Sequence, residues 1–132
     1  IGAFVSGMDA GKIYNSWPLM GTSYFPDDNT FSNLFNLNAF NDPSIVQFMH
    51  RNLAYVIFFF YLIISYNIYK RKLIDFYYSI IIVGLLLIAQ IILGIFTLLY
   101  GAQIYLASMH QITSIFLVSS SIYFLYLNSS SN

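Results

Sequence analysis

The 132-residue sequence contains no cysteine and few charged residues. The absence of cysteine excludes disulfides, thiolate catalysis, iron–sulfur ligation and cysteine zinc sites, but leaves the redox compartment open. Lys, Arg, Asp and Glu make up 8% of the residues, against about 25% in a typical soluble domain. The formal net charge is zero, which argues against nucleic acid as a partner. So few charges cannot build a water-facing surface, and we therefore expect most of the surface to face lipid.

Hydrophobic residues make up 58% of the chain and aromatic residues 20%, and they gather in three long runs. Each run exceeds the roughly 20 residues that a membrane-spanning helix needs. The predicted segments are the end of a transmembrane helix (1–11), an outer loop (12–43), a transmembrane helix (44–69), an inner basic loop (70–72), a transmembrane helix (73–99), an outer turn (100–103), a transmembrane helix (104–127) and an inner tail (128–132). The predicted fold is an all-α transmembrane helix bundle.

Local signals refine these boundaries. The sequence Asn-Asp-Pro-Ser at 41–44 is typical of a helix start, with a capping residue followed by proline. Within the loop, 30–40 is predicted to hold a short amphipathic helix lying on the membrane surface. Because the chain opens on Ile1 rather than Met, and 1–5 is already apolar, we expect the sequence to belong to a longer protein.

The charges predict an orientation in the membrane. Three of the five basic residues lie at 70–72, and four of the five acidic residues lie in or near the 12–43 loop. The positive-inside rule therefore places 70–72 in the cytoplasm or the mitochondrial matrix, and the long loop outside.

This topology brings together His50 and His110, which are the only two histidines in the chain. His50 lies about six residues into the first full span and His110 about seven into the third, and both spans run inward. At about 1.5 Å per residue, both side chains lie roughly 9–10 Å below the outer boundary. We therefore expect the two histidines to meet at one depth, on two parallel helices of one bundle.

Small residues accompany the pair and predict a slot between the helices. Ala54 follows His50 by one turn, and Ala107 precedes His110 by one turn. The intervening span carries a stripe of small and polar residues at helical spacing: Gln90, Gly94, Thr97 and Gly101. For Gln90 and Thr97, hydrogen bonding between helices and contact with a ligand are both open.

An iron porphyrin suits such a slot, since two imidazoles from facing helices can ligate one iron in the core of a bundle. Zinc would need more ligands than two histidines. We predict His50 and His110 as the iron ligands, with Arg51, Ala54, Gly94 and Ala107 as further haem-binding residues. Arg51 could pair with a propionate, although an arginine at this depth is also a common interface anchor. Two other hypotheses for the histidines are hydrogen bonding between helices and a proton path.

Four stretches, taken in order, resemble the C-terminal half of the heme A synthase family. They are the glycine-rich start and loop (2–11 and 14–20), the histidine–arginine helix (46–55), the following helix (90–99) and the last histidine helix (106–111). The likeness covers nearly all of the chain.

The resemblance implies half of an eight-helix protein built from two four-helix bundles. Such enzymes of the bacterial plasma membrane or mitochondrial inner membrane oxidise the methyl group of heme O to the formyl group of heme A, for cytochrome oxidase. It also implies a heme b between His50 and His110. The heme O substrate would be held by an N-terminal half or by a separate partner chain. The resemblance assigns no catalytic residue and no electron acceptor to this chain.

One feature departs from the family, because many members carry a cysteine pair in the outer loop and this chain has none. A thiol step therefore cannot run through this segment. Two functional alternatives are a bis-histidine electron carrier of the cytochrome b type and a haem-free structural subunit of a membrane complex.

Overall fold

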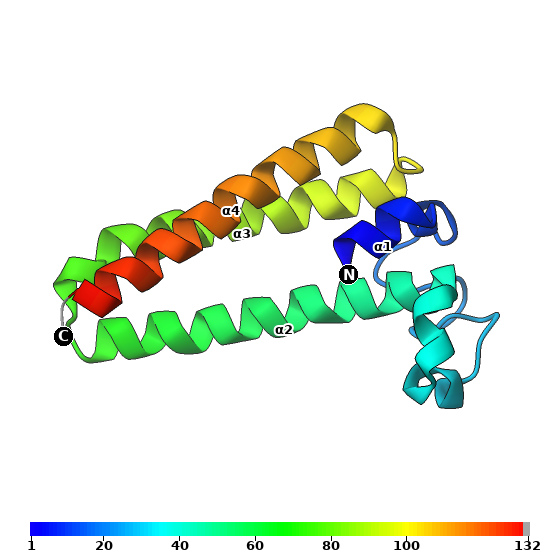
Figure 1. Ribbon diagram of the computed structural model, residues 1–132, viewed down its shortest axis with the longest axis horizontal. Coiled ribbons are helices and arrows are strands. Elements are labelled where there is room, and N and C mark those ends of the chain that lie inside the picture. The colour runs from blue at the N-terminus through cyan, green and yellow to red at the C-terminus, as the bar shows by residue number, and fades with distance from the viewer. Residues whose placement is uncertain (131–132) are drawn as a thin grey trace.

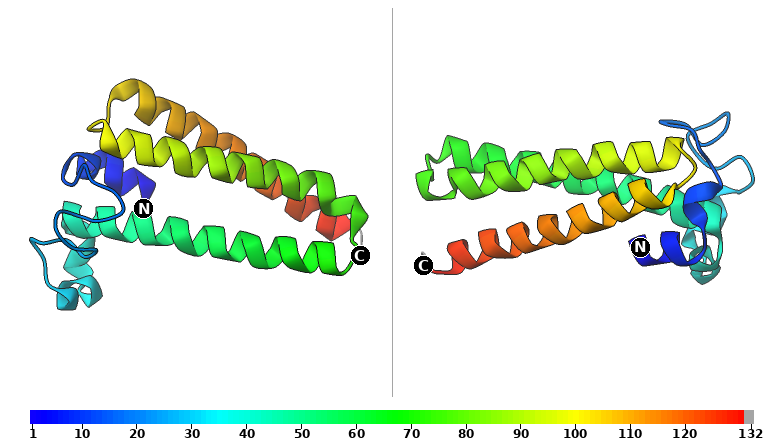
Figure 2. Two further views of the ribbon diagram at one scale, coloured as in Figure 1. Left: turned by 180° about the vertical axis from the view of Figure 1, so that it is seen from behind. Right: turned by 90° about the horizontal axis from the view of Figure 1, so that it is seen from above.

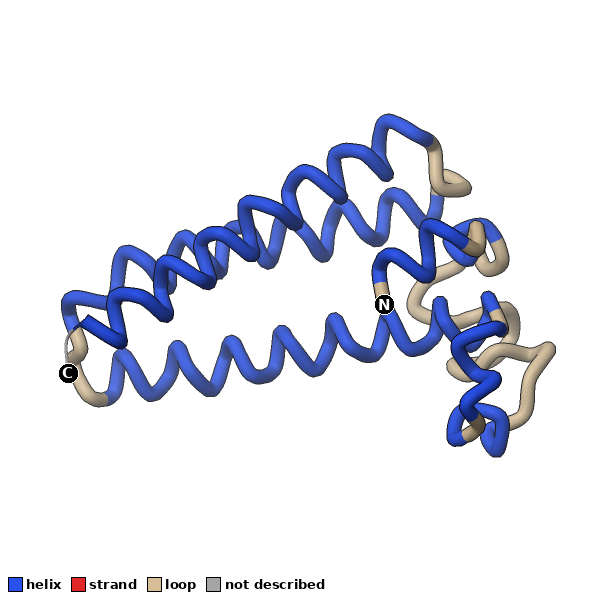
Figure 3. Tube along the Cα trace, in the orientation of Figure 1, coloured by secondary structure: helices blue, strands red, loops and turns tan. Residues whose placement is uncertain are grey.

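The computed structural model describes residues 1–130, which form helices, turns and loops but no β-strand. Three long helices dominate it (Figures 1 and 3): α2 (Pro43–Lys70), α3 (Tyr77–Leu99) and α4 (Ile104–Ser130). Each is long and apolar enough to cross a membrane. The protein is therefore a multi-pass membrane protein, and the predicted all-α bundle with three full spans is confirmed. Its place as half of an eight-helix protein stays a prediction.

The three helices form a wedge. Helices α3 and α4 run antiparallel along each other (Figures 1 and 2), whereas α2 converges with them only near 70–73. Toward the opposite end α2 diverges from the pair, and the short helix α1 (Gly2–Gly7) lies beside it there. The 12–43 loop gathers at this wide end, which we call the loop end of the bundle.

Helix α2 begins as its sequence predicts. Pro43 is the first helical residue, and the Asp42 carboxylate caps the helix by accepting from the backbone N–H groups of Ser44 (2.9 Å) and Ile45 (3.1 Å). Asp at the cap and proline in the first turn are both favoured because the first N–H groups of a helix have no partner within it. The helix ends before Lys72, whose φ of 55° is left-handed and reverses the chain.

Three helix boundaries differ from the prediction. Helix α1 ends at Gly7, and a 3₁₀ turn (η1, Ala10–Lys12) follows, because Asp9 adopts a left-handed φ of 53°. The second span opens with a 3₁₀ turn (η4, Ile74–Phe76) before α3. Helix α4 continues through Ser130, into the predicted tail, since no proline or glycine interrupts it; 131–132 lie outside the described residues.

The predicted amphipathic helix at 30–40 is wrong. Two short 3₁₀ helices stand there instead, η2 (Phe31–Phe35) and η3 (Leu37–Asn41). Asn36 separates them in an extended conformation, and its side chain accepts from the N–H of Asn38 to cap η3. Asparagine offers the backbone such local bonds in place of a continuous helix.

Polar side chains hold the 12–43 loop together. Asp28 accepts hydrogen bonds from the hydroxyls of Tyr14 (2.9 Å) and Ser44 (2.7 Å), which joins the start of the loop to the start of α2. Asp27 accepts from the backbone N–H of Thr22 at 2.7 Å and from the hydroxyl of Ser23 at 2.9 Å. The loop is thus a folded cap rather than an extended linker.

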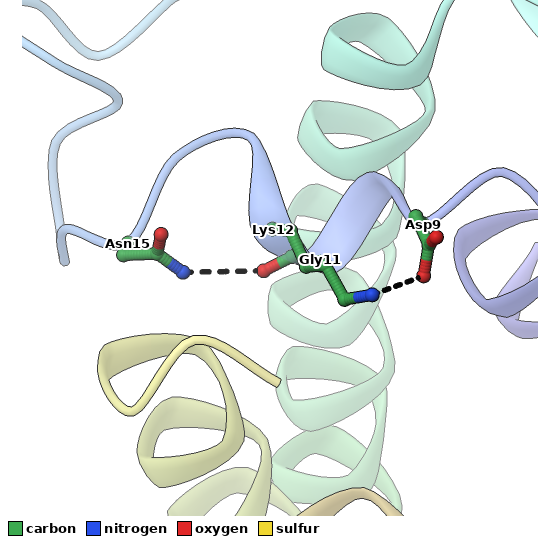
Figure 4. Close-up of polar contacts among 4 residues, drawn as sticks. All are labelled: Asp9, Gly11, Lys12 and Asn15. Atoms are coloured by element: carbon green, nitrogen blue, oxygen red, sulfur yellow. Dashed lines mark hydrogen bonds and ion pairs between the residues drawn. The ribbon is translucent and has the colours of Figure 1, made fainter. Parts of the chain in front are cut away.

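The loop is also tied to the helices beside it. Asn15 donates to the carbonyl of Gly11 at 3.3 Å (Figure 4) and to that of Leu98, near the end of α3, at 2.8 Å. Lys12 and Asp9 form an exposed ion pair at 2.8 Å on the far side of the same turn (Figure 4). The bond to Leu98 fixes the loop over the region where α2 and α3 diverge.

Candidate functional site

A cavity of about 330 Å³ opens between the diverging helices at the loop end. Its walls come from all four α-helices, from η1 and from the loop. Most of the lining is apolar, which suits a hydrophobic ligand that presents a few polar groups. Five of the six predicted cofactor-binding residues line it: His50, Arg51, Ala54, Gly94 and His110. Ala107 is not among the lining residues.

The two histidines face each other in this cavity. His50 comes from α2 and His110 from α4, and their ring centroids lie 6.4 Å apart with the ring planes at 84°. The prediction that the two rings meet, which was made from the shared direction of the two spans and the depth of each histidine, is confirmed. Their role as iron ligands stays a prediction.

A glycine lies near each ring, and one of them makes room for His110. A Cβ on Gly94 of α3 would lie 3.0 Å from Cε1 of His110, closer than side chains normally approach. The His110 ring therefore lies directly against the backbone of α3. Gly2 of α1 lies near the other ring, where a Cβ would stand 3.9 Å from Cε1 of His50, an ordinary contact that does not require a glycine.

Gln90 of α3 orients His110. Its amide nitrogen donates to the backbone carbonyl of His110 at 3.0 Å and lies 3.3 Å from the ring Nε2. The hydrogen bonding between helices that was one possibility for Gln90 is present, and its contact with a ligand stays a prediction. Its amide oxygen has no partner within the protein and belongs to a residue that lines the cavity.

Unpaired polar atoms gather around this cavity. In residues 1–130, six buried side-chain polar atoms lack a hydrogen-bond partner, and five belong to residues of the lining: Gln47 Oε1, Arg51 Nε, Gln90 Oε1, Thr97 Oγ1 and His110 Nδ1. An unsatisfied buried polar group costs about 1–3 kcal/mol. The cavity wall therefore offers several polar atoms that a group placed in the cavity would be able to bond.

The protein offers an imidazole pair rather than a complete metal cage. Among residues 1–130, no group of three or more His, Cys, Asp or Glu side chains could hold a metal ion together. His50 and His110 would thus be the two side-chain ligands that this part of the protein offers to a metal in the cavity.

Arg51 binds the loop. Its Nη1 donates to the carbonyls of Ser16 (3.0 Å) and Leu19 (3.3 Å), and its Nη2 donates to the carbonyl of Tyr14 (3.0 Å). These bonds occupy its terminal nitrogens in the structure, and the pairing of Arg51 with a propionate stays a prediction. Nothing in the sequence signals these bonds, because the acceptors are backbone carbonyls.

The lining also includes residues that the sequence analysis did not predict, and three of them form hydrogen bonds between the loop and α2. Trp17 of the loop donates to the hydroxyl of Tyr55 of α2 at 3.1 Å, and both side chains line the cavity. Gln47, one turn before His50, is 2% exposed and donates to the carbonyl of Tyr14 at 3.1 Å. The sequence pointed to one of these residues only, because Gln47 lies one turn before His50 and so on the same face of the helix.

Comparisons with known proteins bear on this site. The model of a family described as "Cytochrome oxidase assembly protein" (COX15-CtaA) matches residues 1–122. The chain is 46% identical over 129 residues to a heme A synthase of Pelagibacter ubique, covering 98% of this chain and 38% of that protein. It is 42% identical over 134 residues to a heme A synthase of Rickettsia prowazekii, covering 98% and 39%.

A heme A synthase of Wolbachia pipientis is 41% identical over 124 residues, covering 94% of this chain and 34% of that protein. The chain thus spans less than two fifths of the length of these relatives. No solved structure matches it.

Proposed function

This chain belongs to the cytochrome oxidase assembly family COX15-CtaA, and on that basis we propose that it is the haem-binding part of a heme A synthase. The proposed reaction of the whole enzyme oxidises the methyl group of heme O to the formyl group of heme A. The chain would form the C-terminal half, beside an N-terminal half or partner chain that holds the substrate.

The distance between the two histidine rings carries the proposal. An imidazole nitrogen keeps about 2.0–2.1 Å from a bound metal such as zinc, and its ring centre lies about 1 Å farther away, so two imidazoles on opposite sides of one metal hold their centres about 6 Å apart. The observed separation of 6.4 Å fits one iron between the rings of His50 and His110. His50 and His110 would thus hold the iron of a haem, whose porphyrin supplies the other ligands.

The rest of the cavity also fits the group. Its mostly apolar walls suit a porphyrin, and its unpaired polar atoms suit a ligand with polar substituents. His50 and His110 would hold the iron, while Gln90 fixes the backbone of His110 and Gly94 gives its ring space. A bound heme b would supply one-electron exchange through its iron.

The membrane setting is part of the proposal. The long 12–43 loop would face the outside, and 70–72 would face the cytoplasm or the matrix, since that loop carries three consecutive basic residues. The membrane would be a bacterial plasma membrane or a mitochondrial inner membrane.

The test uses the complete protein in its membrane, with His50→Ala and His110→Ala as separate variants. Each variant should lose the low-spin bis-imidazole absorption spectrum, because the second axial ligand is gone. Asn67→Ala is the matched control, since Asn67 lies at the far end of α2 and its side chain donates to the Ile63 carbonyl of the same helix. Both histidine variants keeping a normal low-spin spectrum would overturn the ligand assignment.

A second measurement separates the proposed activity from its alternatives. Haems extracted from membranes that make heme O should include heme A with the wild-type protein and little or none with either histidine variant. Bound haem without any conversion would identify an electron carrier of the cytochrome b type. Well-folded wild-type protein without a Soret band would identify a haem-free structural subunit.

A further inference from the structure

The guanidinium of Arg51 makes all of its hydrogen bonds to one short stretch of backbone. The acceptors are the carbonyls of Tyr14, Ser16 and Leu19, at 3.0, 3.0 and 3.3 Å. We call 14–19 the cover segment. Hydrogen bonds from a charged donor are about twice as strong as neutral ones, so this side chain is the main electrostatic anchor of the segment.

The cover segment is attached to both walls of the wedge. From α2, Gln47 donates to the carbonyl of Tyr14 at 3.1 Å, and Tyr55 accepts from Trp17 at 3.1 Å. Toward α3, Asn15 donates to the carbonyl of Leu98 at 2.8 Å. The segment therefore bridges the two helices whose divergence opens the cavity.

The segment also forms part of the site itself. Trp17 lines the cavity together with His50, Arg51 and Tyr55. The next residue, Met20, is 1% exposed, so its side chain is shielded while the segment is in place. Displacing the segment would take Trp17 out of the cavity wall, and we expect it to expose Met20, the next residue.

We propose that Arg51 is a positioning residue that holds the cover segment closed over the histidine cavity, and so keeps water away from the histidine pair. The planar guanidinium reaches three carbonyls at once with two of its nitrogens. A lysine ammonium at this position keeps the charge but lacks the two planar terminal nitrogens of arginine, and so cannot reproduce the bonds to the three carbonyls.

The consequence for a bound haem rests on the proposed function, whereas the closure of the segment does not. Solvent access and hydrogen bonding around a haem set its reduction potential. Opening the segment should therefore shift the midpoint potential even when the positive charge at position 51 is kept.

Closure of the cover segment is measured with a cysteine reporter in the complete protein. Any cysteines that the complete protein has outside this chain are replaced first. Met20→Cys should react slowly with a membrane-impermeant maleimide when Arg51 is present. Combining it with Arg51→Gln or Arg51→Lys should speed the reaction about tenfold or more, since the loss of even one charge-assisted hydrogen bond changes an equilibrium by that order. Leu37→Cys is the control, because Leu37 is 88% exposed and should react quickly in every background.

A haem midpoint titration accompanies the labelling. The Arg51→Lys protein should differ from wild type in midpoint potential as well as in labelling rate. Wild-type behaviour of Arg51→Lys in both measurements would mean that charge alone matters and would overturn the proposal. An unchanged labelling rate in Arg51→Gln would overturn it as well.

A gentler variant guards against loss of folding. Tyr55→Phe removes only the acceptor for the Trp17 indole and should also speed the labelling of Met20→Cys. If Arg51→Gln does not fold, wild-type labelling rates in both Arg51→Lys and Tyr55→Phe overturn the proposal. Labelling is measured with and without haem, so a protein that binds no haem refutes the proposed function and still reports on the cover segment.

Discussion

Gly94 and His110 lie so close that a Cβ on the glycine would stand 3.0 Å from Cε1 of the imidazole. The ring of His110 therefore lies against the bare backbone of α3, and its position depends on a missing side chain. Gln90, one turn earlier on the same helix, bonds the same residue. Helix α3 thus contains neither of the proposed iron ligands, but it sets the position of one of them, His110.

Replacing this glycine should disturb the candidate haem site. Gly94→Ala is expected to push the His110 ring away from α3 and weaken haem binding by about 1–3 kcal/mol, the usual cost of overpacking. A haem titration of the complete protein measures the affinity. Gly7→Ala is the matched control, because a Cβ there meets nothing within 4 Å. Equal affinities of the Gly94 and Gly7 variants would contradict the prediction.

A second glycine should govern packing rather than binding. A Cβ on Gly84 of α3 would overlap the hydroxyl of Tyr61 of α2, which donates to the carbonyl of Ile80 at 3.2 Å. Gly84→Ala should displace Tyr61 and lower the free energy of unfolding by about 1–3 kcal/mol. Tyr61→Phe loses only the hydrogen bond and should cost about 1 kcal/mol. Thermal melting in detergent compares the two, and a smaller loss for Gly84→Ala would argue against this packing.

The 12–43 loop should loosen in acid. The backbone N–H of Thr22 and the hydroxyl of Ser23 donate to Asp27 and lower the pKa of its carboxyl. Burial raises the pKa of Asp28, but the hydroxyls of Ser44 and Tyr14 outweigh this and hold it below the ordinary value.

Carboxyls with a lowered folded-state pKa stabilise the fold fully above their unfolded value of about 3.9, and this contribution is lost as the pH falls through the folded value. The fluorescence of Trp17, the only tryptophan of this chain, should therefore change below about pH 4. Asp28→Asn should weaken that transition in a protein whose other tryptophans are replaced. A transition of the same size in Asp28→Asn would show that Asp28 takes no part in it.

The orientation in the membrane can be read from two reporters. Ile74→Cys, 71% exposed beside the basic loop, should react with an impermeant maleimide only from the cytoplasmic or matrix side. Leu37→Cys, 88% exposed, should react only from the opposite side. Neither change alters a charge, so the positive-inside signal is kept. The reverse pattern would invert the topology while leaving His50 and His110 level with each other.

Much of the arrangement could be predicted from the pattern of apolar runs. The cap at Asp42, the three spans and the meeting of His50 with His110 are all present in the structure, and the resemblance to the heme A synthase family is confirmed by the comparisons. The short helix expected at 30–40 was wrong because Asn36 caps a new turn there. The apolar residues of 30–40 predicted an apolar helix face, but they could not predict that Asn36 would interrupt the helix.

The sequence by itself determined the number of spans and the depth of the histidine pair. A backbone in lipid must satisfy its polar groups within each helix, so each long apolar run forms a helix that crosses the membrane. The length of each span and the alternating direction of successive spans then follow from the sequence. Only the tertiary structure decided that Arg51 binds the carbonyls of 14–19, that Trp17 joins the cavity wall and that His110 lies against Gly94. These contacts depend on how a polar loop folds back onto the helices, and backbone carbonyls are the same at every position of a sequence.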